Sequence, residues 1–203
     1  MQSELLTLIA ARTGHFRLES GHHGNLWLDL DPLFLRPSRL RRFVAGLADK
    51  LAKHNVEAVC GPLTGGAFLA QAVAAALDVE FYYTERVVPA ERNALYAMTY
   101  RLPGGLRERV RGRATAVVDD VINAGSALRG TLAELRACGA TPAAVGALLV
   151  LGSAAAGLCT DQAIPLECLA ALPNELWAPA DCPLCAAHIP LEDLTAGKPE
   201  HTL

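Results

Sequence analysis

The chain has 203 residues, of which 52% are hydrophobic and 19% are charged, and its formal net charge is −3. These values exclude a mainly disordered chain, which would be poorer in apolar residues and more strongly charged. They also argue against non-specific binding of nucleic acid, because such binding depends on surplus Lys and Arg. No apolar run reaches the roughly 20 residues of a membrane span, and no basic start precedes an apolar stretch at the N-terminus. We therefore expect a cytoplasmic protein with no membrane or nucleic-acid partner.

Apolar spacing and turn residues predict alternating helices and strands in the first half of the chain. Ser38 is a suitable N-cap for the first helix, because its hydroxyl can accept a hydrogen bond from a backbone N–H. The expected elements are a helix over 38–51, a strand over 56–60, an Ala-rich helix over 67–77 and a strand over 80–84. Residues 86–113 contain several Pro and Gly and are expected to form a long excursion.

The second half continues the alternation. The expected elements are a strand over 114–118, a helix over 126–138 that ends at Gly139, and strands over 142–151 and 166–172. The tail from residue 173 is expected to wrap around the domain. This pattern predicts an α/β fold in which helices flank a mainly parallel sheet. Because we find no internal repeat and no linker, we expect residues 1–203 to form a single domain.

The six cysteines occur without a secretion signal, which favours free thiols over a disulfide framework. Cys182 and Cys185, with His188 shortly after them, have the spacing of metal ligands. A structural zinc ion normally needs four ligands, often from two such pairs. Since a second pair is missing, we interpret the segment as a packed turn, and a zinc site is the alternative.

Two adjacent acids, Asp119 and Asp120, follow a strand that we expect to be buried, and they would be costly there without partners. The next loop contains Gly125 and ends at Ser126, where a helix is expected to begin. Backbone N–H groups at a helix start bind anions, and glycine allows a ligand to come close. An acid pair beside such a loop fits a ligand with vicinal hydroxyls and a phosphate, namely a phosphorylated ribose. The alternative is an ordinary turn before a helix that Ser126 caps.

The same stretch resembles the phosphoribosyl-pyrophosphate signature of the type I phosphoribosyltransferases. Four mostly apolar residues, two acids, two apolar residues and a small-residue loop occur in the family order, in Thr115, Ala116, Val117, Val118, Asp119, Asp120, Val121, Ile122, Ala124, Gly125 and Ser126. Asn123 departs from the pattern, because the family usually has a hydroxyl residue there. Its amide can still form a hydrogen bond with a phosphate.

Within this family the chain is most similar to the orotate phosphoribosyltransferase group. Residues 14–21, continuing to Asp29, resemble the N-terminal base-site segment of that group, and residues 61–66 resemble its pyrophosphate loop. The tail around Cys182 and Cys185 resembles the tail of some bacterial and archaeal members. The resemblance implies the type I phosphoribosyltransferase fold, with a small hood from about residues 1–35 plus the C-terminal tail, and a homodimer.

The resemblance also implies roles for individual residues in a transfer from phosphoribosyl pyrophosphate (PRPP) to a nucleobase. Asp119 and Asp120 would be catalytic and hold the ribose hydroxyls. The other expected contacts are with the ribose phosphate (Asn123, Ala124, Gly125, Ser126), pyrophosphate (Thr64, Gly65, Gly66, Arg86) and the base (Trp27, Leu28). Mg²⁺ would bind mainly through oxygens of the ligand and water. A tight turn at the two glycines and a buried tryptophan in the hood are the plain structural alternatives.

Several positions depart from the orotate group. Glu19 stands where that group has a Lys, and residues 153–156 lack its Arg, although a carboxylated base favours a cation. Residues 87–102 contain no Lys or His, so Arg86 is our first choice for the pyrophosphate cation. Arg92 and Arg101 are the other choices, and both are more readily explained as surface charges.

His22 and His23 either approach the base site or belong to a surface turn. The basic run at Arg107, Arg109, Arg111 and Arg113 suggests a solvated element rather than a nucleic-acid site. We therefore predict a magnesium-dependent phosphoribosyltransferase of pyrimidine biosynthesis with orotate as its first-choice base. The alternatives are transfer to another base and a non-catalytic regulator that binds PRPP or a nucleotide.

Overall fold

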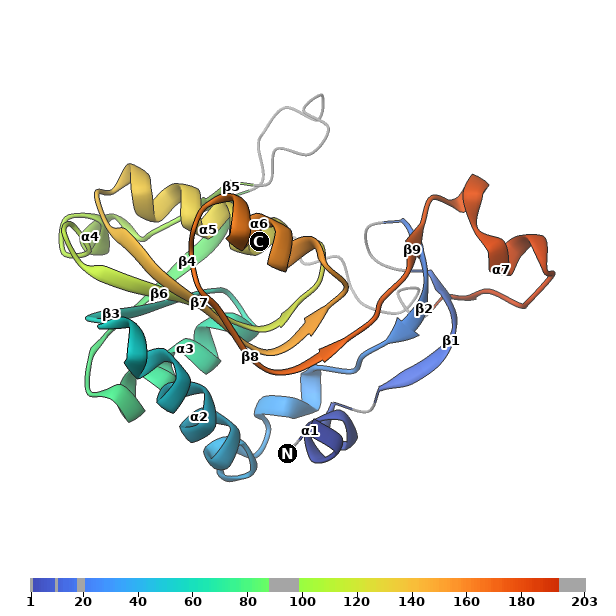
Figure 1. Ribbon diagram of the computed structural model, residues 1–203, viewed down its shortest axis with the longest axis horizontal. Helices are drawn as coiled ribbons and strands as arrows, with labels where there is room; N and C mark the ends of the chain where they lie inside the picture. Colours follow the sequence, from blue (N-terminus) through green and yellow to red (C-terminus); the bar gives the residue numbers. More distant parts are fainter. Residues whose placement is uncertain (1, 10, 18–20, 88–98, 194–203) are drawn as a thin grey trace.

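The computed structural model describes residues 2–9, 11–17, 21–87 and 99–193, which form two sheets with flanking helices (Figure 1). The larger sheet has six strands, which lie in the order β5 (Thr99–Arg101), β4 (Glu80–Val87), β3 (Ala58–Pro62), β6 (Ala114–Ile122), β7 (Thr141–Leu151) and β8 (Leu166–Leu172). All neighbouring pairs are parallel except β4 and β5. The α/β fold with a mainly parallel sheet is therefore confirmed.

Helices cover both faces of this sheet (Figure 1). One face carries α2 (Pro37–Leu51) and α3 (Gly65–Leu77), and the other carries α5 (Ser126–Ala137) and α6 (Ala154–Asp161). The central strand β6 supplies both hydrophobic cores, since Ala116 and Val118 pack on the α2 and α3 side whereas Val117 and Ile122 pack on the α5 side. This alternation explains why residues 116–118 of β6 are apolar at every position.

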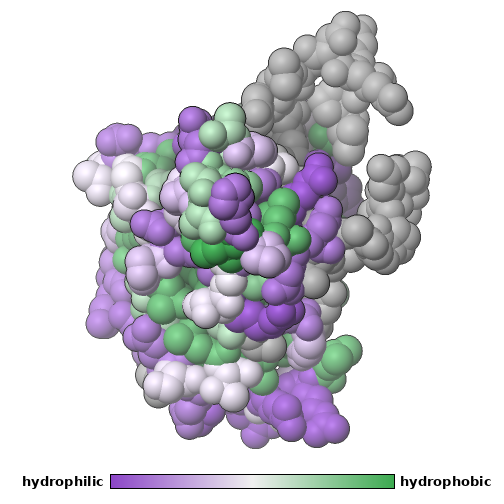
Figure 2. Space-filling view, turned by 90° about the vertical axis from the view of Figure 1, so that its right-hand side faces the viewer, coloured by the Kyte–Doolittle hydropathy of each residue, from purple (hydrophilic) through white to green (hydrophobic). Residues whose placement is uncertain are grey.

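The second sheet, which we call the hood sheet, joins the two ends of the chain. Its strands lie in the order β10 (Glu192–Asp193), β1 (Arg12–Arg17), β2 (His23–Trp27) and β9 (Leu176–Trp177). The short helix α7 (Pro183–Ala186) connects the two C-terminal strands, and α1 (Gln2–Leu8) precedes β1. Figure 1 shows the hood sheet standing to one side of the larger sheet, where β8 leads into β9. Seen from that side, the surface is a mixture of hydrophobic and hydrophilic residues (Figure 2).

The remaining elements are one short helix and three single turns of 3₁₀ helix, at α4 (Gly104–Arg107), η1 (Asp31–Phe34), η2 (Ala52–His54) and η3 (Pro179–Asp181). Among the described residues, no helix combines the length and apolar character needed to cross a membrane.

Most elements that the sequence predicts are present, with shifted ends. Strand β4 continues to Val87 and β6 continues to Ile122, so the two acids lie inside the strand rather than after it. The N-cap prediction for Ser38 is wrong: α2 begins at Pro37, with Arg36 as its N-cap residue. Proline suits the first helical position because the N–H that it lacks would have no partner there. Part of the expected excursion, residues 88–98, lies outside the described residues.

Candidate active site

The acid pair, Asp119 and Asp120, lies near the carboxyl end of β6 and is buried, with 9% and 8% of each residue exposed. The backbone N–H of Asp120 donates to Asp119 Oδ1 at 3.1 Å, and the N–H of Val121 donates to Asp120 Oδ1 at 2.8 Å. Burial raises the pKa of both carboxyl groups, and the charge of Asp120 raises the pKa of Asp119 further. Removal from water thus opposes two adjacent charges at this position.

The glycine loop (residues 61–66) faces the acid pair from the end of β3 and the start of α3. A Cβ atom added to Gly65 would collide with the carboxylate of Asp120, and one added to Gly66 would lie 2.6 Å from Asp119 Oδ1. Glycine at both positions therefore lets the acid pair lie against the first turn of α3. That turn leaves backbone N–H groups without partners inside the helix, which suits an anion.

The neighbouring strand β4 holds the glycine loop in place. The backbone N–H of Leu63 donates to the carbonyl of Thr84 at 2.8 Å, and the peptide bond between Leu63 and Thr64 is cis. The hydroxyl groups of Thr84 and Thr131 are 2.8 Å apart in a fully buried hydrogen bond, which ties β4 to α5. These threonines were not singled out in the sequence, because their pairing depends on the tertiary fold.

The helix-start loop (residues 123–126) connects β6 to α5. Gly125 has φ +76°, the left-handed conformation that favours glycine, and α5 begins at Ser126. Ala124 and Ser126 are exposed, so the loop is open to solvent. The amide oxygen of Asn123 accepts a hydrogen bond from Asn174 at 2.9 Å, which anchors this loop to the segment after β8. Asn174 therefore supports the helix-start loop, and the sequence did not indicate this role.

A pocket of about 560 Å³ opens over the acid pair and the glycine loop. Its lining combines the acid pair and residues of the glycine loop with apolar side chains, among them Leu30, Phe34, Leu35 and Phe68. The rings of Phe34 and Phe68 lie 5.5 Å apart. The segment that joins the hood sheet to α2 thus forms a wall of the pocket. A lining with both polar and apolar groups suits a ligand with a hydrophilic and an apolar part.

The two residues expected to contact a base are not among the residues that line this pocket. Trp27 is half-buried in β2, with its ring 6.2 Å from that of Phe16, and Leu28 packs against the hydrophobic core on the α2 side. Glu19 lies outside the described residues. Ser153 is the N-cap residue of α6, and the helix begins at Ala154. The base contacts of Trp27 and Leu28 therefore stay predictions.

The three candidate arginines differ in their surroundings. Arg86 is exposed near the end of β4, opposite Tyr100 of β5. Burial raises the pKa of Tyr100, while the positive charge of Arg86 lowers it and the charge of Asp119 raises it. Arg101 instead pairs with the buried Glu134 at 3.2 Å, and Arg92 lies outside the described residues.

Possible metal ligands occur in two places. The acid pair offers carboxylate oxygens, which hard cations such as Mg²⁺ prefer. A second set, with cysteine and histidine ligands, lies in the hood region. There His23 is buried and faces His15 and the cysteine pair, so the prediction of an exposed surface turn is wrong for His23.

Comparison with known proteins relates this arrangement to one family. Residues 37–179 match the family model described as the phosphoribosyl transferase domain. An orotate phosphoribosyltransferase of Thermotoga petrophila is 32% identical over 183 residues, which cover 90% of each chain.

Two solved structures share the fold. The orotate phosphoribosyltransferase of Aeropyrum pernix superimposes with a TM-score of 0.67 at 24% identity, over 85% of this chain and 94% of that one. The adenine phosphoribosyltransferase of Thermoanaerobacter pseudethanolicus gives a TM-score of 0.62 at 15% identity, over 84% and 99%. At these identities the structural likeness concerns the fold alone.

Proposed function

The chain belongs to the phosphoribosyl transferase family, and from this premise we propose that it transfers the 5-phosphoribosyl group of PRPP to orotate and releases pyrophosphate. A ring nitrogen of the base forms the new bond to the anomeric carbon of the ribose, and the bond from that carbon to pyrophosphate breaks. The observation that carries the proposal is the buried acid pair set against two glycines at the start of α3. The orotate specificity of relatives such as the Thermotoga petrophila protein supports the choice of base.

We assign the acid pair to the ribose. Vicinal hydroxyl groups can donate hydrogen bonds to the outer oxygens of Asp119 and Asp120, and these bonds compensate for the loss of water around the carboxylates. The same negative charge lies where positive charge develops on the sugar as pyrophosphate leaves. Electrostatic stabilisation of this kind is often the largest contribution to catalysis.

The two loops are assigned to the two phosphate-bearing ends of PRPP. The helix-start loop, residues 123–126, would bind the 5-phosphate through backbone N–H groups and the Ser126 hydroxyl. The glycine loop, with Thr64, Gly65 and Gly66, would bind pyrophosphate. Arg86, exposed on the strand next to the glycine loop, would supply a cation for the leaving group.

The carboxylate donor set of this site fits Mg²⁺, which prefers oxygen ligands and retains several waters. Most of its ligands would be oxygens of PRPP, with the acid pair nearby. When bound, the ion would neutralise negative charge on the leaving pyrophosphate. We include Mg²⁺ dependence and a homodimer in the proposal. Metal removal with a chelator tests the first, and the molar mass from light scattering tests the second.

Two features favour a different base as the second candidate. Glu19 stands where the orotate group has a Lys, and residues 153–156 contain no arginine. The sequence of residues 87–102, which lacks Lys and His, is the feature that favours a non-catalytic regulator.

Pyrophosphate release with a panel of bases separates these candidates. Turnover with orotate above all other bases is the expected result. Turnover with a purine or another pyrimidine alone would replace orotate by that base. Tight PRPP binding without turnover on any base would refute the enzyme and support the regulator.

A further inference from the structure

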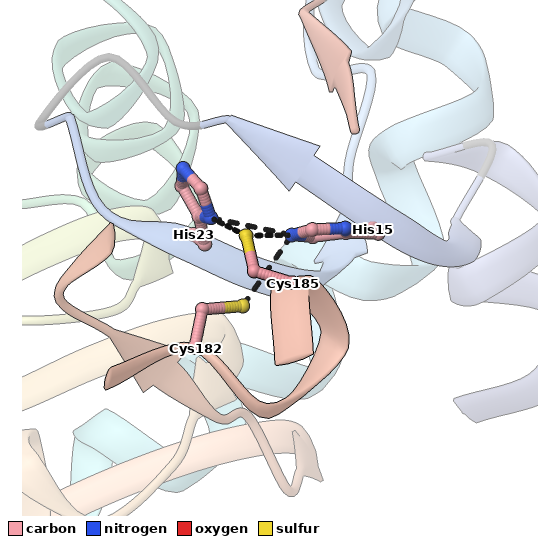
Figure 3. Close-up of side chains that lie close together, drawn as sticks. All are labelled: His15, His23, Cys182 and Cys185. Carbon is pink, nitrogen blue, oxygen red and sulfur yellow. Dashed lines mark hydrogen bonds between the residues drawn. The ribbon is translucent and has the colours of Figure 1, made fainter. Parts of the chain in front are cut away.

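Four potential metal ligands converge between the hood sheet and the C-terminal tail (Figure 3). His15 comes from β1, His23 from β2, and Cys182 and Cys185 flank the start of α7. One ligand atom of each residue lies within 4.8 Å of all the others. The cysteines are far from the histidines in sequence, 167 positions in the case of Cys182 and His15, so only the fold brings them together.

The distances between the ligand atoms agree with a tetrahedral site. His15 Nε2 lies 3.2 Å from His23 Nδ1, 3.4 Å from Cys182 Sγ and 3.7 Å from Cys185 Sγ, and Cys185 Sγ lies 3.2 Å from His23 Nδ1. In a tetrahedral zinc site, bond lengths of about 2.0–2.1 Å to nitrogen and 2.3 Å to sulfur separate the ligand atoms by about 3.3–3.8 Å. Four of the six distances between the ligand atoms are thus close to those of such a site, and all six are within 4.8 Å.

A hydrogen bond outside the group sets the orientation of His15. Its Nδ1 lies 2.8 Å from the backbone carbonyl oxygen of Ile189, which can only accept, so this nitrogen carries the proton. In the neutral ring, Nε2 then has a free lone pair, and it is the nitrogen that faces the cysteines. Metal-binding histidines commonly donate their second N–H to a carbonyl or carboxylate in this way.

Three of the four ligands are buried. His15, His23 and Cys182 have 2%, 7% and 3% of each residue exposed, whereas Cys185 is exposed on the outer side of the group. Four ligands leave no open position for a substrate or a water. This is the arrangement of a structural site rather than a catalytic one.

We propose that His15, His23, Cys182 and Cys185 form a structural zinc site that fastens the C-terminal tail to the hood sheet. Two thiolates and two imidazoles in a tetrahedral arrangement favour Zn²⁺ over hard cations such as Mg²⁺. On binding, the two thiols release their protons to solvent, and the sulfur atoms bind the metal as thiolates.

The other contacts between the C-terminal tail and the rest of the hood sheet are weak, so the tail needs the metal site to hold it in place. Strands β9 and β10 are two residues long, and short pairings of this kind are marginal by themselves. The ion pair of Arg12 with Glu192, at 2.9 Å, is about half exposed, and exposed pairs stabilise little. A metal ion bound by both ends of the chain would hold the hood sheet together where these contacts do not.

The first experiment measures metal in the purified full-length chain, prepared with a thiol reductant and without chelator. About one zinc ion per chain is expected. After removal of zinc and addition of Co²⁺, we expect intense visible absorption typical of tetrahedral Co²⁺ and charge-transfer bands from two thiolates. Loss of zinc is expected to lower the thermal stability of the chain, and added Zn²⁺ is expected to restore it.

Variants then test which residues bind. Cys182→Ser and Cys185→Ser should each weaken zinc binding by more than about 100-fold, since each removes a direct ligand and loss of an outer-shell partner alone costs about 10–100-fold. Cys168→Ser is the matched control for the thiols. His188→Asn is the control for a nearby histidine, because His188 lies outside the group and its φ of +54° is one that asparagine tolerates. Both controls should keep the full metal content.

Three results would overturn the proposal. The first is a reduced full-length chain that binds no stoichiometric zinc, and the second is wild-type zinc content in both cysteine variants. The third is a Co²⁺ spectrum without thiolate bands, which decides the question even if the variants fail to fold. Because none of these measurements uses PRPP or a base, they are independent of the proposed transferase activity.

Discussion

Replacing Gly66 by alanine tests the close approach between the glycine loop and the acid pair. The added Cβ would lie 2.6 Å from Asp119 Oδ1 and 2.7 Å from the Pro62 ring, whereas ordinary contacts begin at 3.4 Å. The proline ring cannot rotate away, so the first turn of α3 must move by roughly 0.7 Å to restore an ordinary contact. Forcing an extra carbon into a packed site typically costs about 1–3 kcal/mol.

The control for this prediction is Gly157→Ala in α6, where no atom lies within 4 Å of the added Cβ. There, alanine should stabilise the chain by about 0.5–1 kcal/mol, because it favours the helix. Gly66→Ala should instead lower the melting temperature by about 2–12 °C, at 2–4 °C per kcal/mol for a chain of this size. A displacement approaching 1 Å should also slow transfer by about 100-fold. Thermal unfolding and steady-state rates measure both effects. A Gly66→Ala protein as stable and active as the Gly157→Ala protein would refute the reasoning.

Further predictions concern the charged groups. Asp119→Asn and Asp120→Asn should each lower the transfer rate at least about 100-fold, as measured by steady-state kinetics. Neither change should lower the stability of the unliganded chain in a denaturant titration, because burial penalises the charged carboxylates. The folded-state pKa of both groups lies above the usual 3.8, so the folded chain binds protons more readily than the unfolded chain. The stability of the unliganded chain should therefore fall as pH rises from about 4 through the raised pKa values. A double Asn variant should lack that fall, and an unchanged pH profile would contradict the account. Arg86→Ala should lower kcat/KM for PRPP by about tenfold or more, whereas Arg101→Ala should retain near-normal kinetics. A large loss in Arg101→Ala with near-normal kinetics in Arg86→Ala would assign the pyrophosphate contact to Arg101. Glu134→Ala should destabilise the chain by about 2–3 kcal/mol in a denaturant titration, because the buried carboxylate accepts from the backbone N–H of Leu102 and pairs with Arg101; a change within about 0.5 kcal/mol would show that this pair contributes little.

The sequence predicted five of the six strands of the larger sheet and the helices α2, α3 and α5, because their signals are local; β5 and α6 were not predicted. Apolar spacing marks α2, and Gly139, with φ +81°, follows the end of α5 as expected. The individual strands of the hood sheet were not predicted, since two-residue strands such as β9 have no periodicity. Strands β9 and β10 exist through pairing with residues more than a hundred positions away, as Trp177 with His23.

The two candidate sites differ in the same way. The acid pair and the helix-start loop are contiguous in the chain, so one short motif contained most of the transferase site. The zinc ligands come from the two ends of the chain, and the sequence offered His188 beside the cysteines instead of His15 and His23. An additional signal was present in His15 and His23 themselves, because histidines eight positions apart in a short antiparallel hairpin can face the same partner.

The two helix starts near the pocket have different electrostatic tasks. At α3, the glycines bring the partial positive charge of the helix N-terminus against the acid pair, which offsets part of the cost of its burial. At α5, the helix-start loop is exposed, and the same partial charge stays available to an anion from solution. A ligand that fits both must present hydroxyl donors to the carboxylates and a phosphate to the open loop. Among small metabolites, a phosphorylated sugar combines these groups, so the electrostatics of the unliganded site lead to the same class of substrate as the family does.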